Sequence, residues 1–195
     1  TILASSSPTR ARLLSAAGVE FTADPAALDE ASVKSSLQSE GADGRRVAEV
    51  LAELKAQAVS HRHPDDLVIG ADQVLECDGC LYDKPRDVDA ARDQLRKLRG
   101  RSHSLHSAAV VVRTATPLWR HVGTVRLTMR PFSDDFLETY LAVVGGDVCS
   151  SVGGYQLEGR GVQLFETVEG DYFAILGLPL LPLLDFLRGY GVIRS

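Results

Sequence analysis

The chain has 195 residues, of which 45% are hydrophobic and 24% are charged, and its formal net charge is −5. These values fit one domain, or one domain divided into two lobes, with a substantial core. The acidic balance argues against a general nucleic-acid-binding protein, whose surface is usually basic. Three cysteines do not make a disulfide framework, and no apolar run reaches the length of a membrane span. We therefore expect a soluble, cytoplasmic protein.

The N-terminus is predicted to form a short strand over residues 1–4 and a helix that begins at Pro8. Ser7 is a favourable N-cap, and proline is favoured at the first helical position. A strand, a hydroxyl-rich turn and a helix N-terminus leave backbone N–H groups where a phosphate can bind. Arg10, in the first turn, would add a guanidinium that grips phosphate oxygens. The alternative is that the serines only cap the helix and that Arg10 is solvated.

A second strand is predicted over residues 21–23, followed by a loop that ends in the acidic pair Asp29 and Glu30. Such a pair is most often solvated. Residues 45–61 show helical periodicity. The apolar residues expected on one face of this helix are Val47, Val50, Leu51, Leu54 and Ala58. Lys55 is expected on the shoulder of that stripe, either reaching toward a site or snorkelling at the core boundary.

Residues 67–85 are the stretch around which the chain is expected to be organised. Residues 67–69 are an apolar run typical of a buried strand, and Asp72 follows where we expect that strand to end. Ligands bind beyond the carboxyl ends of strands in open α/β sheets, so this carboxylate has a chemical reason to be there. Asp78-Gly79 predicts a tight hairpin turn that carries Lys84 back toward Asp72. The alternative is a surface ion pair.

The hairpin contains Cys77 and Cys80, and a CxxC motif invites a redox or zinc interpretation. A thioredoxin-type CxxC opens a helix, whereas this one brackets a turn. A structural zinc needs four ligands, and Cys149 is the only other cysteine. Both interpretations are disfavoured.

The second half of the chain is predicted to alternate helices and strands around a glycine-dense loop. The expected helices cover residues 87–98, 133–143 and 177–190, and the expected strands cover residues 102–113, 117–130 and 163–168. The closing helix is apolar on nearly every side, so it should be buried. Residues 145–161 are too rich in glycine for a regular element or a core segment, and a long loop of this kind is usually functional.

Seven motifs in this order resemble the Maf family. They are LASSSPTRARLL (3–14), DE (29–30), LKA around Lys55, GADQV (70–74), KP (84–85), GGYQLEG (153–159) and LGLPL (176–180). The resemblance covers residues 1–195 as a single domain. It implies an α/β fold with a two-lobed mixed sheet and flanking helices around a deep cleft, similar to the inosine triphosphatases, and a homodimer. It also implies hydrolysis of a nucleoside triphosphate to the monophosphate and pyrophosphate with a divalent cation, Mg²⁺, Mn²⁺ or Co²⁺.

Carried over residue by residue, the resemblance assigns catalytic positions to Glu30, Lys55, Asp72 and Lys84, and substrate-binding positions to Ser5 and Arg10. An ionised Asp72 beside a metal can act as the base for water or as a ligand, with Glu30 helping to hold the metal. A triphosphate carries about four negative charges, so lysines and Arg10 would stabilise it.

Three positions distinguish branches of the family. Members that prefer dTTP and UTP tend to have Arg, Thr and Gln there, and members that prefer 7-methyl-GTP tend to have Trp, Gln and Glu. This chain has Thr9, Gln73 and Glu158, so two of the three match the methylguanine branch. A carboxylate at 158 can accept from the N1–H and N2 amine of guanine. Thr9 fits neither branch, and dTTP/UTP hydrolysis stays the alternative.

Two other classes of function compete with this one. A nucleotide-binding regulator of septum formation could keep Arg10 and the lysines, but Asp72 and Glu30 would weaken simple anion binding. A CxxC oxidoreductase would show thiol-dependent activity that survives the loss of Asp72.

Overall fold

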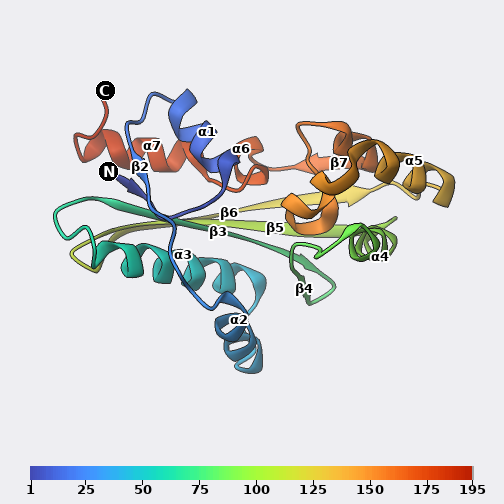
Figure 1. The fold of residues 1–195 in the computed structure, drawn as a ribbon, viewed down its shortest axis with the longest axis horizontal. Coiled ribbons are helices and arrows are strands. Elements are labelled where there is room, and N and C mark those ends of the chain that lie inside the picture. The colour runs from blue at the N-terminus through green and yellow to red at the C-terminus, as the bar shows by residue number, and fades with distance from the viewer. Residues whose placement is uncertain (195) are drawn as a thin grey trace. The chain divides into compact units, whose positions relative to one another are not determined.

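The computed structural model describes residues 1–194, which form a mixed α/β fold (Figure 1). The strands are β1 (Ile2–Leu3), β2 (Thr22–Ala23), β3 (Val68–Cys77), β4 (Cys80–Tyr82), β5 (Ser102–Arg113), β6 (Thr116–Met129) and β7 (Phe165–Glu169). The helices are α1 (Pro8–Ala16), α2 (Glu30–Ser39), α3 (Gly44–Ser60), α4 (Val88–Leu98), α5 (Asp134–Val144), α6 (Tyr172–Ile175) and α7 (Leu180–Gly189), with 3₁₀ helices η1 (Gly145–Ser150), η2 (Val152–Gly154) and η3 (Arg160–Leu164).

The seven strands form one sheet with the order β2-β1-β3-β5-β6-β7, and β4 pairs with β3. β1 runs parallel to β2 and β3, whereas β3 with β4 and β6 with β7 are antiparallel. The mixed sheet with flanking helices confirms the fold class predicted from the sequence. No helix among residues 1–194 is long and apolar enough to cross a membrane.

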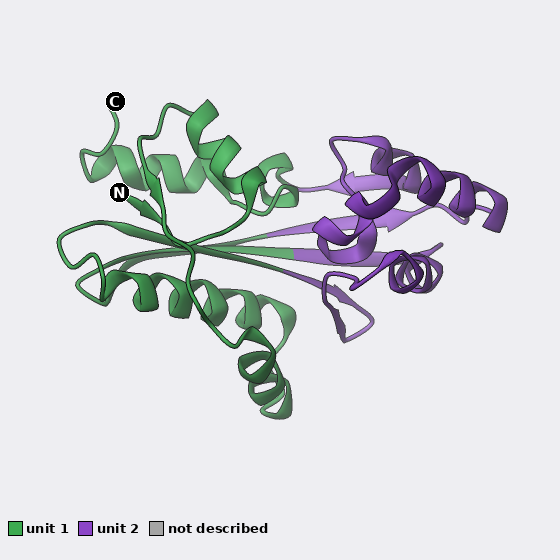
Figure 2. Ribbon diagram, viewed as in Figure 1, with its two compact units in different colours: residues 1–73, 106–123, 171–195 green, residues 74–105, 124–170 purple. Residues whose placement is uncertain are grey.

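The chain divides into two compact units (Figure 2). Unit 1 contains Thr1–Gln73, His106–Gly123 and the C-terminal segment from Asp171, and unit 2 contains Val74–Leu105 and Thr124–Gly170. The long strands β3, β5 and β6 contribute residues to both units. Each unit is therefore built from segments that are distant in the sequence.

In unit 1, helices cover both faces of the sheet. Alternate residues of a strand point to opposite faces, and Ile69 and Ala71 of β3 belong to the apolar cluster that contains residues of α1 and α7. Gly70 lies between them, and a Cβ atom at this position would point to the other face, which α3 covers (Figure 1). The residues of β3 therefore divide their contacts between two layers of helices.

Helix α3 approaches β3 unusually closely at Gly70. A Cβ atom built on Gly70 would lie 2.1 Å from the carbonyl oxygen of Ala52 and 2.8 Å from the Cβ of Ala56. No side chain fits in that space. The absence of a side chain on Gly70 and the small side chains of Ala52 and Ala56 are what let this helix lie directly on the strand.

This close approach explains why the buried face of α3 differs from the predicted stripe. The buried residues of the helix are Gly44, Val47, Ala48, Leu51, Ala52, Lys55, Ala56, Val59 and Ser60. Val50, Leu54 and Ala58 are only half-buried. The prediction followed the large apolar residues, but the alanines face the sheet. Lys55 consequently lies within the buried face rather than on its shoulder.

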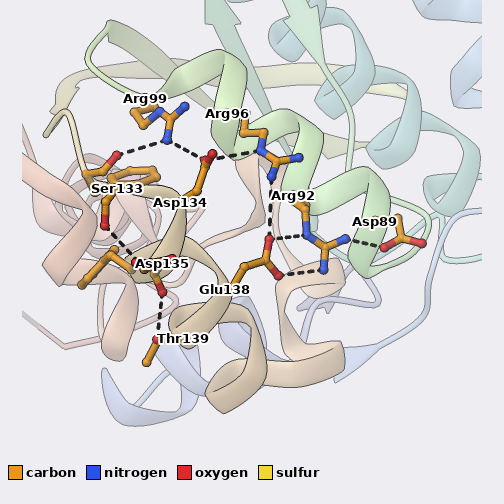
Figure 3. A network of polar contacts seen from close by, with 11 residues as sticks. Asp89, Arg92, Arg96, Arg99, Ser133, Asp134, Asp135, Glu138 and Thr139 are labelled. Atoms are coloured by element: carbon orange, nitrogen blue, oxygen red, sulfur yellow. Dashed lines mark hydrogen bonds and ion pairs between the residues drawn. The ribbon is translucent and has the colours of Figure 1, made fainter.

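In unit 2, an ion-pair network joins α4 to α5 (Figure 3). Arg92 donates to both carboxylate oxygens of Glu138, at 2.7 and 3.1 Å. About two turns beyond Arg92, at the C-cap of α4, Arg99 donates to Asp134 at 2.8 Å, and Arg96 lies between, 3.6 Å from Asp134. Exposed pairs contribute little stability individually. Their regular spacing instead defines which faces of the two helices meet.

The glycine-dense segment contradicts the prediction of an irregular, non-core loop. It contains η1, η2 and the start of η3, and buries Val148, Val152, Gly153, Gly154, Tyr155 and Gly161. Gly153 has φ of 82°, a left-handed conformation that favours glycine. A Cβ on Gly161 would lie 2.4 Å from the carbonyl oxygen of Gln156. These glycines permit close backbone packing. A high glycine content alone does not distinguish such packing from an irregular, exposed loop.

The predicted hairpin is confirmed. Cys77 pairs with Cys80 across Asp78 and Gly79, whose φ angles are 49° and 75°. Two positive φ angles are the requirement of a tight type I′ turn. Both cysteines are free thiols on opposite strands of this hairpin.

Three other features differ from the prediction. Helix α2 was not expected, because no apolar stripe marks it in the sequence. In the structure none of its residues is buried. Helix α7 begins at Leu180 rather than residue 177, after the separate short helix α6. Leu181 of α7 is 57% exposed, so the helix is amphipathic and not buried on every side.

Candidate active site

Asp72 lies in the middle of β3, not at its end as the sequence predicted. The strand continues through Asp72 to Cys77. Asp72 follows Gly70 by two residues, so its side chain points to the same face of the sheet, toward α3. It is 5% exposed. The narrow gap at Gly70 thus brings a buried carboxylate against the buried face of the helix.

Lys55 joins Asp72 to a second carboxylate. Its Nζ atom lies 2.6 Å from Oδ1 of Asp72 and 2.9 Å from Oε1 of Glu30. Glu30 is the first residue of α2, whose N-cap is Asp29: the Asp29 side chain accepts from the backbone N–H of Ser32. The acidic pair therefore has two separate roles, one in capping and one in the ion pair with Lys55.

The electrostatics of Asp72 are dominated by its burial, which raises its pKa above the ordinary value. The positive charges of Lys55 and Arg10 oppose this effect, and the negative charge of Glu30 adds to it. The second oxygen, Oδ2, is buried and has no hydrogen-bond partner within residues 1–194. A buried carboxylate oxygen without a partner is costly unless a ligand or water completes it.

The N-terminal turn has the predicted capped geometry. Ser7 is the N-cap of α1 and accepts from the backbone N–H of Arg10, and Pro8 is the first helical residue. Ser5 is buried and accepts from the backbone N–H of Ser7 at 3.2 Å. Thr9, in the first turn of α1, is half-buried.

Arg10 is not solvated but bridges three segments of unit 1. Its Nη1 donates to Oγ of Ser5 at 3.1 Å and to the carbonyl oxygen of Ala71 at 3.0 Å. Its Nε donates to the carbonyl oxygen of Gly177 at 2.8 Å. Burial lowers the pKa of Arg10, and the carboxylates of Asp72 and Glu30 oppose that effect.

The two cations of the site, buried Lys55 and half-buried Arg10, differ in how their charge is compensated. Lys55 contacts two carboxylates, whereas all the acceptors that Arg10 contacts within residues 1–194 are neutral oxygens. The charge of Arg10 is held in place without being cancelled by a direct ion pair. This is the arrangement expected of a binding group for an anion.

Gln73 points away from Asp72, to the opposite face of β3. Its Nε2 atom lies 3.0 Å from Oγ of Ser107, 3.0 Å from the carbonyl oxygen of Ala174 and 2.9 Å from that of Ile175. Ser107 is fully buried in β5 and donates to Ala174 at 2.6 Å. Ser107 was not among the residues expected at the site, although a hydroxyl beside the apolar run that fills β5 was an available signal.

Unit 1 thus brings together Ser5, Arg10, Glu30, Lys55 and Asp72, which are spread over 68 positions of the sequence. Lys84, which follows β4, and Glu158, between η2 and η3, belong to unit 2, and both are exposed.

The donor atoms of the site fit a hard divalent cation. Oxygen ligands suit Mg²⁺ and Mn²⁺, and Oδ2 of Asp72 is an oxygen that has no other partner in residues 1–194. No group of three or more His, Cys, Asp or Glu in the described chain could hold a metal by itself. Asp72 and Glu30 would therefore supply two carboxylates, and phosphate oxygens and water the remaining ligands, as is usual for Mg²⁺.

Comparison with known proteins places the chain in one family. The family model described as Maf-like protein matches residues 1–190. A protein of Paramagnetospirillum magneticum named nucleoside triphosphate pyrophosphatase is 56% identical over 190 residues, 97% of this chain and 98% of its own length. A protein of Rhizobium meliloti named 7-methyl-GTP pyrophosphatase is 53% identical over 194 residues, 100% of this chain and 98% of its own length.

Proposed function

The chain belongs to the Maf family and is a nucleoside triphosphate pyrophosphatase, and from this premise we propose that Asp72, Lys55, Glu30 and Arg10 form its reaction site. The reaction is the attack of water on the anhydride between the α- and β-phosphates. Its products are a nucleoside monophosphate and pyrophosphate. The single observation that carries the assignment is the buried, unpartnered Oδ2 of Asp72 beside two cations.

Asp72 is proposed as the general base. Its Oδ1 is held by Lys55, which fixes the orientation of the carboxylate. Oδ2 is left with two lone pairs, one that can accept a proton from water and one that can contact a divalent cation. Burial raises the pKa of Asp72, which makes the carboxylate a stronger base than an exposed aspartate. The positive charges of Lys55 and Arg10 oppose this rise in pKa and favour the ionised form of Asp72.

Arg10 is proposed to hold the phosphates, with Ser5 and the N-terminus of α1 adding neutral donors. Its charge is not cancelled by a direct carboxylate partner, so it can attract the triphosphate. Lys84 is proposed to supply a further positive charge to the phosphates, as the Maf resemblance implies. A divalent cation held by Asp72 and Glu30 would, when bound, neutralise charge on the phosphates and the leaving pyrophosphate.

For the base, we propose a guanine carrying a 7-methyl group as the preferred substrate. Glu158 offers a carboxylate that can accept from the guanine N1–H and N2 amine and attract the positive charge of the methylated ring. Relatives with this preference in their names are about as similar to the chain as those with the general name. Thr9 offers no aromatic ring to stack on the base, so the preference is relaxed. We also propose that the protein is a homodimer, which sedimentation equilibrium would test.

Pyrophosphate release, measured over canonical and modified nucleoside triphosphates with Mg²⁺, Mn²⁺ and Co²⁺ in turn, tests the proposed substrate. We expect the highest kcat/KM for 7-methyl-GTP and measurable hydrolysis of GTP and UTP. A clear preference for UTP and dTTP would contradict the proposed base. Pyrophosphate release that persists in Asp72→Asn would contradict the proposed site.

A further inference from the structure

The turn between α6 and α7 contacts the guanidinium group of Arg10. Helix α6 has only four residues, so most of its carbonyl groups need partners from outside the helix. Gly177, in the turn, has φ of 92°, and its carbonyl oxygen accepts from Nε of Arg10. A Cβ built on Gly177 would lie 3.5 Å from Nε and Nη2 of Arg10 and 3.8 Å from Cδ of Gln73. Arg10 and Gln73 therefore converge on the same short turn.

Gln73 ties this turn to the sheet through its amide nitrogen. Nε2 lies within 3.0 Å of the carbonyl oxygens of both Ala174 and Ile175. The reverse orientation would place the amide oxygen against two carbonyl oxygens, so the hydrogen-bond network decides the assignment. Both N–H groups of Gln73 are thus committed to neighbours within the protein, and only its Oε1 is left to offer a ligand.

Ser107 completes the attachment from the neighbouring strand. It is fully buried, accepts from Nε2 of Gln73 at 3.0 Å and donates to the carbonyl oxygen of Ala174 at 2.6 Å. A ligand cannot reach such a hydroxyl. Ser107 can therefore affect substrate binding only through Gln73 and Ala174, to which it is hydrogen-bonded.

We infer that Gln73 and Ser107 are positioning residues for Arg10. They hold the end of α6, so that the Gly177 carbonyl meets Nε of Arg10 and fixes the guanidinium plane. An arginine side chain loses rotamer entropy when it is fixed. Holding Arg10 in place before substrate arrives removes this cost from phosphate binding. Gln73 then affects every triphosphate alike, in contrast to the base-reading role expected from the sequence.

This inference rests on the proposed role of Arg10, so the test reads phosphate affinity without base or catalysis. Inorganic tripolyphosphate binding is measured by calorimetry in the full-length protein and in Arg10→Ala, Gln73→Met and Ser107→Ala. We expect Kd to rise about thirtyfold in Arg10→Ala, as for a charged hydrogen-bonding group. We expect rises of about fivefold in Gln73→Met and about threefold in Ser107→Ala, as for groups that act through neutral hydrogen bonds.

The double variant Arg10→Ala/Gln73→Met separates positioning from general damage. If Gln73 acts through Arg10, its substitution changes Kd no further in the Arg10→Ala background. Gln57→Met is the matched control, because Gln57 lies on α3 of the same unit and its side-chain amide donates to Glu53. It should leave Kd and the melting temperature unchanged. In turnover, Gln73→Met and Ser107→Ala should raise KM for GTP and UTP by the same factor with little change in kcat.

Four results would overturn the inference. Full additivity in the double variant would show that Gln73 acts independently of Arg10. A changed ranking of GTP and UTP with an unchanged tripolyphosphate Kd would show that Gln73 reads the base. An Arg10→Ala variant with wild-type Kd would overturn both this inference and the proposed phosphate-binding role. If Arg10→Ala weakens binding and Gln73→Met and Ser107→Ala do not, the positioning role alone is wrong.

Discussion

The Nζ atom of Lys55 lies 2.6 Å from one carboxylate oxygen of Asp72, while the other oxygen is buried without a partner. Oδ1 of Asp72 is therefore held by an ion pair, and Oδ2 is available for the reaction. The two groups come from α3 and β3, 17 residues apart. Their meeting depends on the close approach of that helix to Gly70 of the same strand.

Substitution of Asp72 by Asn should abolish most turnover and preserve the fold. Asparagine has the same shape, but it cannot take a proton from water, and loss of a general base typically costs about two to four decades in rate. The measurement is kcat with saturating nucleoside triphosphate, with circular dichroism as the check on folding. A folded variant with wild-type kcat would show that Asp72 is not the base.

Replacing Arg10 or Lys84 by Ala should weaken triphosphate binding much more than monophosphate binding. Each removes one positive charge that is proposed to contact the phosphate chain, and a monophosphate carries fewer negative charges. Calorimetry with a non-hydrolysable triphosphate and the corresponding monophosphate measures the difference. Equal losses for both ligands would indicate misfolding or a role in base binding.

Substitution of Glu158 by Gln should reduce the preference for 7-methyl-GTP. The amide keeps the hydrogen-bonding shape but loses the charge that attracts the methylated ring, and Thr9 provides no stacking to compensate, an interaction worth about 1 kcal/mol. We expect kcat/KM to fall for 7-methyl-GTP more than for UTP and dTTP. Glu169→Gln, an exposed position in β7 of the same unit, is the control. An unchanged ranking in Glu158→Gln would remove Glu158 from base recognition.

Protonation of His103 should destabilise the fold at low pH. His103 is 2% exposed, its Nε2 lies 2.7 Å from Oη of Tyr155, and burial lowers its pKa from 6.5 to about 4. The folded state binds fewer protons than the unfolded state between these values, so stability is present above pH 6.5 and is lost as the pH falls toward 4. The expected loss by pH 4 is about 3 kcal/mol.

Urea unfolding of the wild type and His103→Gln at pH 7 and pH 4 tests this expectation. The variant cannot titrate at this position, so its stability should change less between the two pH values. His61→Gln is the control, because His61 is exposed at the end of α3. The same acid destabilisation in His103→Gln as in the wild type would assign the effect to other groups.

Gly70→Ala should destabilise the protein by about 2 kcal/mol or more. The new methyl group would clash with backbone and side-chain atoms of α3 that cannot move without separating the helix from the strand. Gly189→Ala is the matched control, because Gly189 lies in α7 with no atom within 4 Å of the new methyl group. Alanine in a helix is favourable by up to about 1 kcal/mol. Urea unfolding distinguishes the two; equal stability of the variants would contradict the close approach.

Local sequence signals predicted several elements correctly. Ser7 and Pro8 marked the start of α1, and Asp78-Gly79 marked the turn of the β3–β4 hairpin. Ser133 likewise marked the start of α5. Each of these signals acts within a few residues of chain, because caps and tight turns are made by neighbouring atoms. Such features do not depend on the rest of the fold.

The structure corrects the expected placement of two residues of the proposed site. Asp72 was expected at the end of a strand but lies within β3, and Lys55 was expected at a helix edge but is buried. Ser107 was not expected at all. The reason is common to the three: their environments are created by segments far away in sequence, and hydrophobic periodicity favours large apolar residues over the alanines and glycine that allow close contact.

The sequence by itself determined the chemistry available to this protein: a capped helix start next to Arg10, two carboxylates, buried strands and the motifs of its family. The tertiary structure alone decided how those groups are used. Only the contact between α3 and β3 places Lys55 between Asp72 and Glu30 and leaves Oδ2 of Asp72 unpartnered. Only the folded chain brings Ser5, Ala71 and Gly177 together, so that neutral oxygens hold Arg10. A pattern along the chain reports which residues are polar or apolar, whereas desolvation and charge pairing depend on neighbours that only folding supplies.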